Sequence, residues 1–573
     1  MTLWVSRHPN LDIPTQITSW EWAFESRDFS PLQQKQKPLA LGGYSNAITG
    51  ERLDFAAVKE IATKLSTVLA RKYGLAPDQT VSLFSTNTIW YPVVMWATVR
   101  IGARVNGASP SYTVEEMAYA LKTAEAKILM TLPSSLEIAV DAATQAGIPR
   151  QHVFLLEGSA PGYLSVQDLI AQYDSERYSP VPYFRIPGGQ TNKDVCGYLN
   201  FSSGTTGHPK AVMLSHHNVI AQCHQLRQLQ VLPEDGRYRI LAVMPLFHIT
   251  GLVRFCTYPV FMNGESIMLP QFTMDAMLQS IIKYRMEELI LVPPIIVRIV
   301  RDPVVDKYLP DLRRIVKRWS SGSAPCLPEV TEQLHRKFPK TGFRQGYGAT
   351  ESTACISSHP PSHFDFKYAR SGGLLMANTV AKVISLDDPN KLLKPGETGE
   401  ICAAGPQIAM GYLGNAAATE ESFDADGFLH TGDVGHITED GLIYIEDRIK
   451  EMIKVKGLQV PPAELEDVLM GHPDVEECAV LGIADPYSGE RPKAYVVVKD
   501  GTAPSGAMGK LLIDLVKQKK VRYKWLVEVE FTESLPRNGT GKLLRRVLKA
   551  QERNGDRSRG LCVSDVDRVQ AKL

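Results

Sequence analysis

Residues 201–212 read FSSGTTGHPKAV, a pattern typical of a loop that binds a polyphosphate. Gly204 and Gly207 lack a Cβ atom, so the backbone there can take positive φ and bring amide N–H groups close to phosphate oxygens. Hydroxyl side chains add donors, and the ammonium group of Lys210 adds a mobile positive charge. The sequence therefore predicts a nucleotide-phosphate site at Ser202, Ser203, Gly204, Thr205, Thr206, Gly207 and Lys210.

This stretch differs from the phosphate loop of ordinary kinases and ATPases. Gly204 and Gly207 are only three positions apart and the lysine follows Pro209, so the pattern GxxxxGK[ST] is not met. A second glycine–lysine string, PRNGTGK at residues 536–542, has Pro536 where that pattern needs its first glycine. An ordinary P-loop enzyme is therefore disfavoured.

Composition sets the broad class of protein. The chain of 573 residues is long enough for more than one hydrophobic core. A net charge of +1 creates no global field that would attract nucleic acid or an anionic membrane. The eight cysteines include no CxxC pair, which indicates free thiols in a reducing compartment. Neither a secretory signal nor an apolar run long enough for a membrane span is found, so we expect a soluble protein without nucleic-acid partners.

The last three residues predict a cellular location. Ala571, Lys572 and Leu573 form a small-basic-leucine terminus close to the peroxisomal address SKL. The polar run before them, residues 554–570, is expected to be disordered and to expose this terminus to an import receptor. We therefore expect a peroxisomal protein, or a cytoplasmic one if the tripeptide is not used.

Hydrophobic periodicity indicates an α/β fold. A helix is expected from the N-cap Asp54 to Gly74, followed by a strand at residues 80–84 and a helix at 89–101. A strand at 195–201, the glycine loop and a helix at 216–229 repeat this alternation. Such alternation is typical of parallel sheets with crossover helices, which bind nucleotides at the carboxyl ends of their strands.

The pattern changes at Lys450, where we place a domain boundary. After a strand at 441–446, the sequence predicts helices at 463–470, 510–518 and 542–551, and strands at 477–483, 494–498 and 527–531. This is a small α+β unit of about 110 residues. The expected organisation is a domain at residues 1–449 and a second at 450–573, the latter ordered to about residue 552 and followed by a tail.

Residues 345–351, QGYGATE, place an aromatic ring, a hydroxyl and a carboxylate close together. These groups suit a stacked base, a phosphate oxygen and a magnesium ion respectively. Both strings resemble motifs of the adenylate-forming superfamily, which comprises acyl-CoA synthetases, nonribosomal adenylation domains and luciferases. The resemblance runs from about residue 40 to residue 552. SSGTTGHPKAVMLSH, PLFHITG and DRIKEMIKVKGLQV are most similar to the 4-coumarate:CoA ligase-like branch.

The resemblance implies a fold and a nucleotide site. The fold is a large N-terminal domain of mixed and parallel sheets flanked by helices, with a small barrel-like part, and a small mobile α+β C-terminal domain. Tyr347 would contact adenine, Thr350 the α-phosphate and Glu351 Mg²⁺, while Asp433 in the TGD motif would accept both ribose hydroxyls. The remaining nucleotide residues implied are Arg448 as a second ribose contact, and Gln345, Gly346, Ser323 and Ala324 around the base.

The resemblance also divides the chemistry between two lysines. Lys542 would bridge the acid carboxylate and the α-phosphate during adenylation, where negative charge builds on phosphorus. Rotation about the hinge Lys450 would then replace it with the face carrying Lys454 and Gly457 for transfer to CoA. In the same comparison His248 forms a wall between the acyl pocket and the thiol tunnel, and Gly322 lines that pocket.

The sequence thus predicts an ATP-dependent acid:CoA ligase that uses ATP, Mg²⁺ and CoA. The branch it resembles includes peroxisomal ligases for medium-chain, aryl and secondary-metabolite acids. A stand-alone amino- or aryl-acid adenylation enzyme is the nearest alternative, although His248 stands where amino-acid enzymes commonly carry an aspartate. A luciferase-like oxygenase shares the same motifs, and a nucleotide-binding regulator without catalysis is disfavoured by Lys210, Glu351, Asp433 and Lys542.

Overall fold

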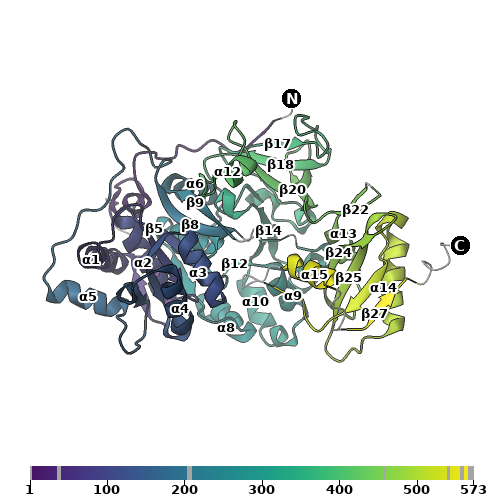
Figure 1. The fold of residues 1–573 in the computed structure, drawn as a ribbon, viewed down its shortest axis with the longest axis horizontal. Coiled ribbons are helices and arrows are strands. Elements are labelled where there is room, and N and C mark those ends of the chain that lie inside the picture. The colour runs from purple at the N-terminus through teal and green to yellow at the C-terminus, as the bar shows by residue number, and fades with distance from the viewer. Residues whose placement is uncertain are drawn as a thin grey trace.

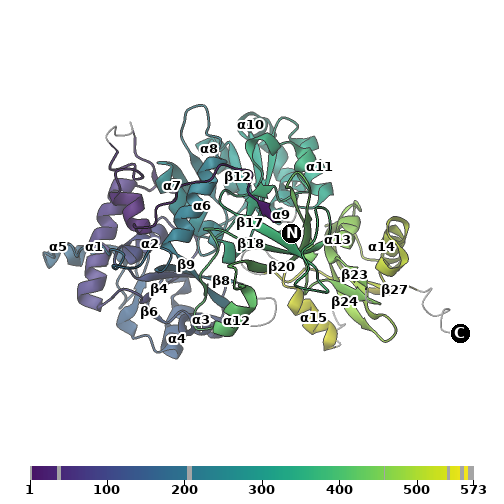
Figure 2. The same cartoon turned by 90° about the horizontal axis from the view of Figure 1, so that it is seen from above.

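The computed structural model describes residues 3–34, 40–202, 209–324, 326–456, 458–537, 543–554 and 560–565. A large N-terminal part holds several sheets with helices around them, and a smaller C-terminal part lies at one end of the molecule (Figures 1 and 2). This α/β architecture confirms the predicted fold class. Among the described residues, no helix combines the length and hydropathy that a membrane crossing requires.

A seven-stranded sheet holds the strand that leads into the glycine-rich loop. Its centre is parallel and its β8–β9–β19 edge is antiparallel. Its strand order is β19 (Gly411–Tyr412), β9 (Lys210–Ser215), β8 (Cys196–Ser202), β5 (Arg104–Ala108), β4 (Thr80–Phe84), β6 (Ala126–Thr131) and β7 (Val153–Leu155). The helices of this region are α1 (Phe55–Tyr73), α2 (Trp90–Arg100), α3 (Val114–Thr123), α4 (Leu136–Ala146), α5 (Val166–Ser175) and α6 (His216–Gln228).

Local sequence explains where the first helix begins and ends. The Asp54 side chain accepts a hydrogen bond from the Ala57 amide at 2.8 Å, which satisfies one of the free N–H groups of the first turn of α1. Gly74 ends the helix with φ of +62°, a conformation that costs glycine little. The predicted helix and the strand at 80–84 are confirmed.

The prediction around the glycine-rich loop was incomplete. The strand and the helix on either side of it are present as β8 and α6, but β9 lies between the loop and α6 and pairs antiparallel with β8. Lys210 is therefore the first residue of a strand, opposite Ser202, and not part of a loop that runs into a helix. The missed segment is a short apolar run, for which periodicity does not separate strand from helix or loop.

Two more sheets form the middle of the large domain. One has the order β10 (Arg239–Ala242), β11 (Glu265–Met268), β2 (Gly43–Asn46) and β3 (Arg52–Asp54). The other has the order β12 (Glu288–Leu291), β13 (Arg318–Ser321), β14 (Gly342–Tyr347), β15 (Ser357–Ser358) and β16 (Leu374–Leu375). Around them lie α7 (Tyr258–Phe261), α8 (Met274–Tyr284), α9 (Pro293–Arg301), α10 (Leu309–Ile315) and α11 (Pro328–Lys337). The π-helix η4 (Gly251–Thr257) leads into α7.

A small antiparallel sheet completes the N-terminal part and leads to the domain boundary. Its order is β1 (Trp4–Val5), β17 (Val380–Ile384), β18 (Gly399–Ala404), β20 (Leu429–Ile437) and β21 (Ile443–Arg448), with α12 (Ala416–Ser422) beside it. The β20–β21 register places Asp433 directly opposite Arg448.

The C-terminal part is a separate sheet with helices. It contains β22 (Ile453–Val455), β23 (Leu458–Val460), α13 (Pro462–Met470), β24 (Val475–Asp485), β25 (Gly489–Val498), α14 (Gly506–Lys519), β26 (Glu528–Phe531), α15 (Arg545–Arg553) and β27 (Cys562–Ser564). The predicted helices and strands are found with shifted ends, but β22, β23 and β27 were missed. The prediction of a disordered tail after residue 552 was wrong for residues 562–564, because they form β27 and pair antiparallel with β26.

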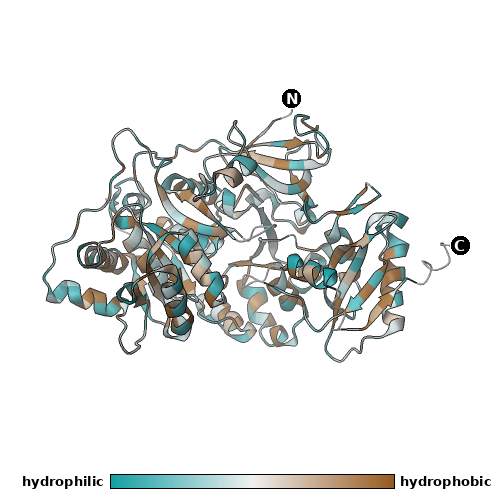
Figure 3. Ribbon diagram, viewed as in Figure 1, coloured by the Kyte–Doolittle hydropathy of each residue, from teal (hydrophilic) through white to brown (hydrophobic). Residues whose placement is uncertain are grey.

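The hydrophobic cores follow this division. Several buried clusters fill the N-terminal part, and a cluster that includes Val460, Leu465 and Leu512 lies inside the C-terminal sheet and its helices. In both parts the strands carry many apolar residues, and along the helices apolar residues alternate with polar ones (Figure 3). Each part therefore has its own core.

Candidate active site

The predicted adenine and ribose residues meet at one point. The Tyr347 hydroxyl, at the end of β14, donates to Asp433 Oδ2 at 2.8 Å, and Arg448 Nε lies 3.2 Å from Asp433 Oδ1. The Asp433 side chain is 9% exposed and that of Arg448 is 35% exposed. Burial, together with the charge of Asp433, raises the pKa of Tyr347, so its hydroxyl stays a donor. The three residues come from three different strands.

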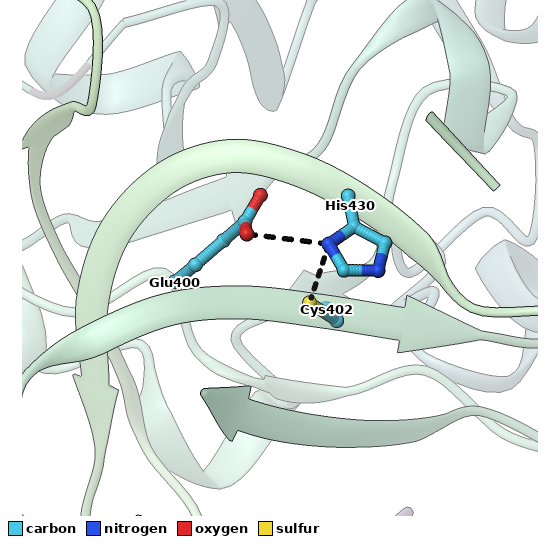
Figure 4. Close-up of side chains that lie close together, drawn as sticks. All are labelled: Glu400, Cys402 and His430. Carbon is cyan, nitrogen blue, oxygen red and sulfur yellow. Dashed lines mark hydrogen bonds and ion pairs between the residues drawn. The ribbon is translucent and has the colours of Figure 1, made fainter. Parts of the chain in front are cut away.

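A second group of side chains supports the turn that carries Asp433. Glu400 Oε1 accepts a hydrogen bond from the Gly432 amide at 3.0 Å, while Glu400 Oε2 lies 3.2 Å from His430 Nδ1 (Figure 4). The same nitrogen lies 3.6 Å from Cys402 Sγ. The hydrogen bond to Glu400 raises the pKa of His430, despite burial that lowers it. Burial raises the pKa of the Cys402 thiol, which disfavours the thiolate that a metal would need.

In this structure these contacts support Asp433 through the Gly432 amide. The sequence analysis predicted none of these three supporting residues, Glu400, Cys402 and His430. No local signal marks Glu400 and Cys402, because they lie about thirty positions away on β18 and reach His430 only through sheet pairing.

Lys210 and Glu351 are brought together through a residue that the sequence analysis missed. Lys210 Nζ lies 4.6 Å from the ring centroid of Tyr412, and the Tyr412 hydroxyl donates to Glu351 Oε1 at 2.9 Å. Tyr412 is in β19, which pairs with β9 beside Lys210. The Ala409 amide also donates to the Glu351 backbone carbonyl at 2.8 Å. Strand β9 and residues 345–351 therefore lie on the same side of the site, joined through Tyr412 and Ala409.

The segment between Tyr347 and Glu351 is tightly held. A Cβ atom on Gly348 would lie 2.1 Å from the Ala354 carbonyl oxygen, so only glycine fits there. Thr350 is buried at the start of the short helix η6 (Thr350–Ser352). The Gln345 side-chain amide accepts from the Cys326 amide at 2.9 Å and donates to the carbonyls of Ala369 and Ser371. Both the side chain and the backbone of Gln345 are thus hydrogen-bonded within the protein, since its backbone amide also donates to His359 Nδ1 at 3.2 Å.

The predicted acyl-site residues border the same region. Gly322 follows β13, and a Cβ atom there would lie 3.9 Å from the Gly346 carbonyl oxygen. Ser323 has φ of +72°, and both Ser323 and Ala324 are exposed. His248 precedes η4, whose Leu252 amide donates to the His248 carbonyl at 3.0 Å.

The segment before His248 is fixed against the seven-stranded sheet. Asn200 Nδ2, in β8, donates to the Phe247 carbonyl at 3.0 Å. A Cβ atom on Gly107, in β5, would lie 2.8 Å from Phe247 Cα. His248 is thereby placed beside the strand that leads into the glycine-rich loop.

The segment that carries the predicted hinge joins Asp433 and Arg448 to the C-terminal part. Asp447 accepts from the Arg448 amide at 2.8 Å and from the Ala463 amide, at the start of α13, at 3.1 Å. Lys450 follows β21, and its neighbour Glu451 lies 3.0 Å from Arg545 Nε. Lys454 is exposed on β22. Lys542, Gly457 and residues 203–207 lie outside the described residues, so their placement stays a prediction.

Comparison with known proteins agrees with this arrangement. The sequence model of the AMP-binding enzyme family matches residues 33–413, and that of the AMP-binding enzyme C-terminal domain matches residues 464–542. Peroxisomal OPC-8:0-CoA ligase 1 of Arabidopsis thaliana is 34% identical over 550 residues, covering 94% of this chain and 93% of its own. 4-Coumarate–CoA ligase 2 of Oryza sativa subsp. japonica is 32% identical, covering 96% and 95%.

Solved structures show the same fold. ATP-bound MatB from Rhodopseudomonas palustris superposes with a TM-score of 0.80 at 25% identity, over 94% of this chain and 99% of its own. The anthranilate CoA ligase AuaEII with anthranoyl-AMP has a TM-score of 0.81 at 22% identity, over 95% and 99%. The chain therefore belongs to the adenylate-forming family of AMP-binding enzymes, among its 4-coumarate–CoA-ligase-like members, and is an enzyme of the AMP-forming acid–thiol ligase class.

Proposed function

We propose that the chain joins a carboxylic acid to CoA in two steps within one cleft. In the first, an oxygen of the acid carboxylate attacks the α-phosphorus of ATP and pyrophosphate leaves, which gives an acyl-AMP. In the second, the CoA thiolate attacks the acyl carbonyl carbon and AMP leaves. Adenylation converts the poor leaving group of a carboxylate into a good one, and binding both partners in one cleft replaces a bimolecular encounter.

The single observation that carries this proposal is the convergence on the segment from Tyr347 to Glu351. On one side Tyr347 contacts Asp433, which in turn pairs with Arg448. On the other side Glu351 contacts Tyr412, whose ring contacts Lys210. The groups of a nucleoside triphosphate would require these side chains in the same spatial order. The base and ribose require a ring and hydrogen-bond acceptors, and the phosphates require a cation and a metal ligand.

Magnesium fits the residues at the phosphate end. Mg²⁺ prefers carboxylate oxygen ligands together with substrate phosphates, and Glu351 supplies a half-buried carboxylate there. When bound, the ion would neutralise phosphate charge. Thr350, Lys210 and the loop at residues 202–207 would hold the phosphates, and Lys542 would bring the acid carboxylate to the α-phosphate.

The acid is proposed to be an aryl, medium-chain or secondary-metabolite acid, in keeping with the relatives named 4-coumarate–CoA ligase and OPC-8:0-CoA ligase. His248 and Gly322 would border its reactive end. A peroxisomal location is supported by the relative named peroxisomal and by the terminus Ala571, Lys572 and Leu573, which lies outside the described residues.

Acid-dependent exchange of labelled pyrophosphate into ATP tests the first step, and mass detection of acyl-CoA tests the second.

Asp433→Asn should raise the KM for ATP by about 10- to 100-fold, because a charged acceptor for the ribose is lost. Asp440→Asn, in an exposed turn of the same sheet, is the matched control and should leave KM unchanged. Acyl-AMP formation without acyl-CoA would favour the stand-alone adenylation enzyme, and no exchange with any acid would refute the proposal.

A further inference from the structure

Three arginines and one glutamate are buried together behind the predicted acyl site. Arg254 is 6% exposed and Arg344 is 4% exposed, and the Arg318 side chain is 12% exposed. Glu288 faces all three guanidinium groups. Burial alone would raise the pKa of Glu288, but Arg344, Arg318 and Arg254 lower it to about 2. The carboxylate is therefore ionised, and it offsets one positive charge of three.

Both oxygens of Glu288 are used by groups other than Arg254. Oε1 accepts from Ser320 Oγ at 2.9 Å and lies 3.4 Å from Arg344 Nη1. Oε2 accepts from Gln230 Nε2 at 3.1 Å and lies 3.4 Å from Arg318 Nη2. Arg344 and Arg318 each have a further acceptor, in Ser358 Oγ and the Val231 carbonyl. These two arginines are thus bonded within the protein.

Arg254 differs from them. Its Nε is buried and has no hydrogen-bond partner in the described part of the chain. Its carbon Cζ lies 5.4 Å from the ring centroid of Tyr258. The hydroxyls of Tyr258 and Tyr238, which interact electrostatically with Arg254, are buried and also without a partner among the described residues. Buried polar groups without hydrogen-bond partners are unfavourable, so these three groups are suited to receive a hydrogen-bond acceptor, and the positive charge of Arg254 favours an anionic one.

The cluster adjoins the acyl site through a short series of neighbours. Gly322 faces the Gly346 carbonyl, and a Cβ atom on Gly346 would lie 3.5 Å from Cys355 Sγ. Cys355 in turn interacts electrostatically with Arg254 and Arg344. From the other side, Arg254 belongs to η4, which begins just after His248. Arg254 is therefore placed beyond the reactive end of an acid held between His248 and Gly322.

We propose that Arg254 binds a second carboxylate at the far end of the substrate, so that the acid is a dicarboxylic acid. This rests on the proposed ligase function and adds the class of its substrate. A guanidinium binds a carboxylate with two parallel hydrogen bonds, and the hydroxyls of Tyr238 and Tyr258 are additional donors in the same cluster. The distal carboxylate would supply the hydrogen-bond acceptor that Glu288, whose oxygens are bonded to other groups, does not give Arg254.

The test compares pairs of acids that differ only in the distal carboxylate, with pyrophosphate exchange as the readout. The pairs are the straight-chain dioic and alkanoic acids from six to twelve carbons, and 3-phenylpropanoic acid with and without a ring carboxyl group. For at least one pair, kcat/KM of the wild-type enzyme should favour the dicarboxylic acid by about 10²-fold or more, because a site built for a polar group rejects the analogue that lacks it. Arg254→Met should abolish or reverse this preference, mainly through the KM of the dicarboxylic acid.

Arg318→Gln is the matched control, because it removes one positive charge from the same cluster but leaves Arg254 in place. It should keep the preference for the dicarboxylic acid. The wild-type comparison decides the proposal even if a variant fails to fold. Equal or better use of the monocarboxylic partner in every pair would overturn the dicarboxylate site while leaving the ligase function intact, and the cluster would then hold only water. No exchange with any acid would overturn the ligase function and this inference together.

Discussion

Asp447 is a buried carboxyl group whose charge is costly. Burial is the main cause that raises its pKa from 3.8 to about 6, while Arg545 and two backbone amides oppose the shift. The folded state binds this proton more tightly than the unfolded state does. The stabilisation that the bound proton gives the folded state is therefore fully present below about pH 3.8. It is lost as the pH rises through about 6. Ionised Asp447 therefore destabilises the fold at neutral pH.

Asp447→Asn should accordingly become more stable relative to wild type as the pH rises. The advantage should grow by about 1 kcal/mol between pH 5 and pH 7, because one pKa unit corresponds to about 1.4 kcal/mol. Urea unfolding of both proteins at each pH measures the difference, and Asp440→Asn, on an exposed turn, should show no such trend. A constant difference across the range would contradict the raised pKa.

Motif residues and their supports differ in how far sequence reveals them. Tyr347, Asp433 and Arg448 were predicted to act together because each stands in a motif, and their contacts agree. Tyr412 and Arg254 stand in no such motif. Tyr412 neighbours Glu351 and Lys210, which are distant from it in sequence. Arg254 likewise neighbours Glu288, which is distant in sequence. Such residues become visible only when strands pair and burial is known.

The same limit applies to helices and strands. The helix α1 could be predicted nearly to its ends because an N-cap aspartate, an apolar stripe and a terminal glycine all agree. β9 and β27 could not, since each is a short segment whose pairing partner decides its conformation. For β27, residues that appeared to be a polar tail form the edge of the C-terminal sheet.

Two truncations test whether β27 is a structural strand. Val563 packs against Gly509 of α14, and Lys517 Nζ lies 2.8 Å from Asp565 Oδ1. Removal of residues 560–573 should lower the free energy of unfolding by about 1–2 kcal/mol, because Val563 loses a partly buried site. Removal of residues 566–573 should not. Differential scanning calorimetry of the C-terminal transition measures both.

The shorter truncation also tests the targeting prediction. It removes Ala571, Lys572 and Leu573 while keeping β27, so it should abolish co-sedimentation with a peroxisomal marker and leave ligase activity unchanged. Continued peroxisomal recovery of this truncated chain would show that the terminal tripeptide is not the address. Equal thermal stability of the two truncations would show that β27 contributes nothing to the fold.

Polar contacts among the described residues join the N-terminal and C-terminal parts, and Leu327 packs against the C-terminal core. Asp447 accepts from the Ala463 amide, and Arg301 donates to the carbonyls of Val475 and Met470 at 3.1 and 3.4 Å. Within the C-terminal part, Arg545, three positions after Lys542, contacts Glu451 beside the predicted hinge Lys450. We expect the C-terminal part to move about Lys450 and so to present different faces to the cleft.

We expect this motion to divide the two half-reactions between Lys542 and Lys454. Lys542→Ala should reduce acyl-AMP formation by about 10²- to 10³-fold, by comparison with other donors that stabilise a charged transition state. It should leave the conversion of supplied acyl-AMP and CoA to acyl-CoA nearly unchanged. Lys454→Ala should impair mainly that second step. Rapid-quench assays of each half-reaction make the measurement, and Lys510→Ala, an exposed lysine on α14, should affect neither. If both active-site variants lost both half-reactions equally, the two lysines would share one role and domain rotation would not be needed to explain the chemistry.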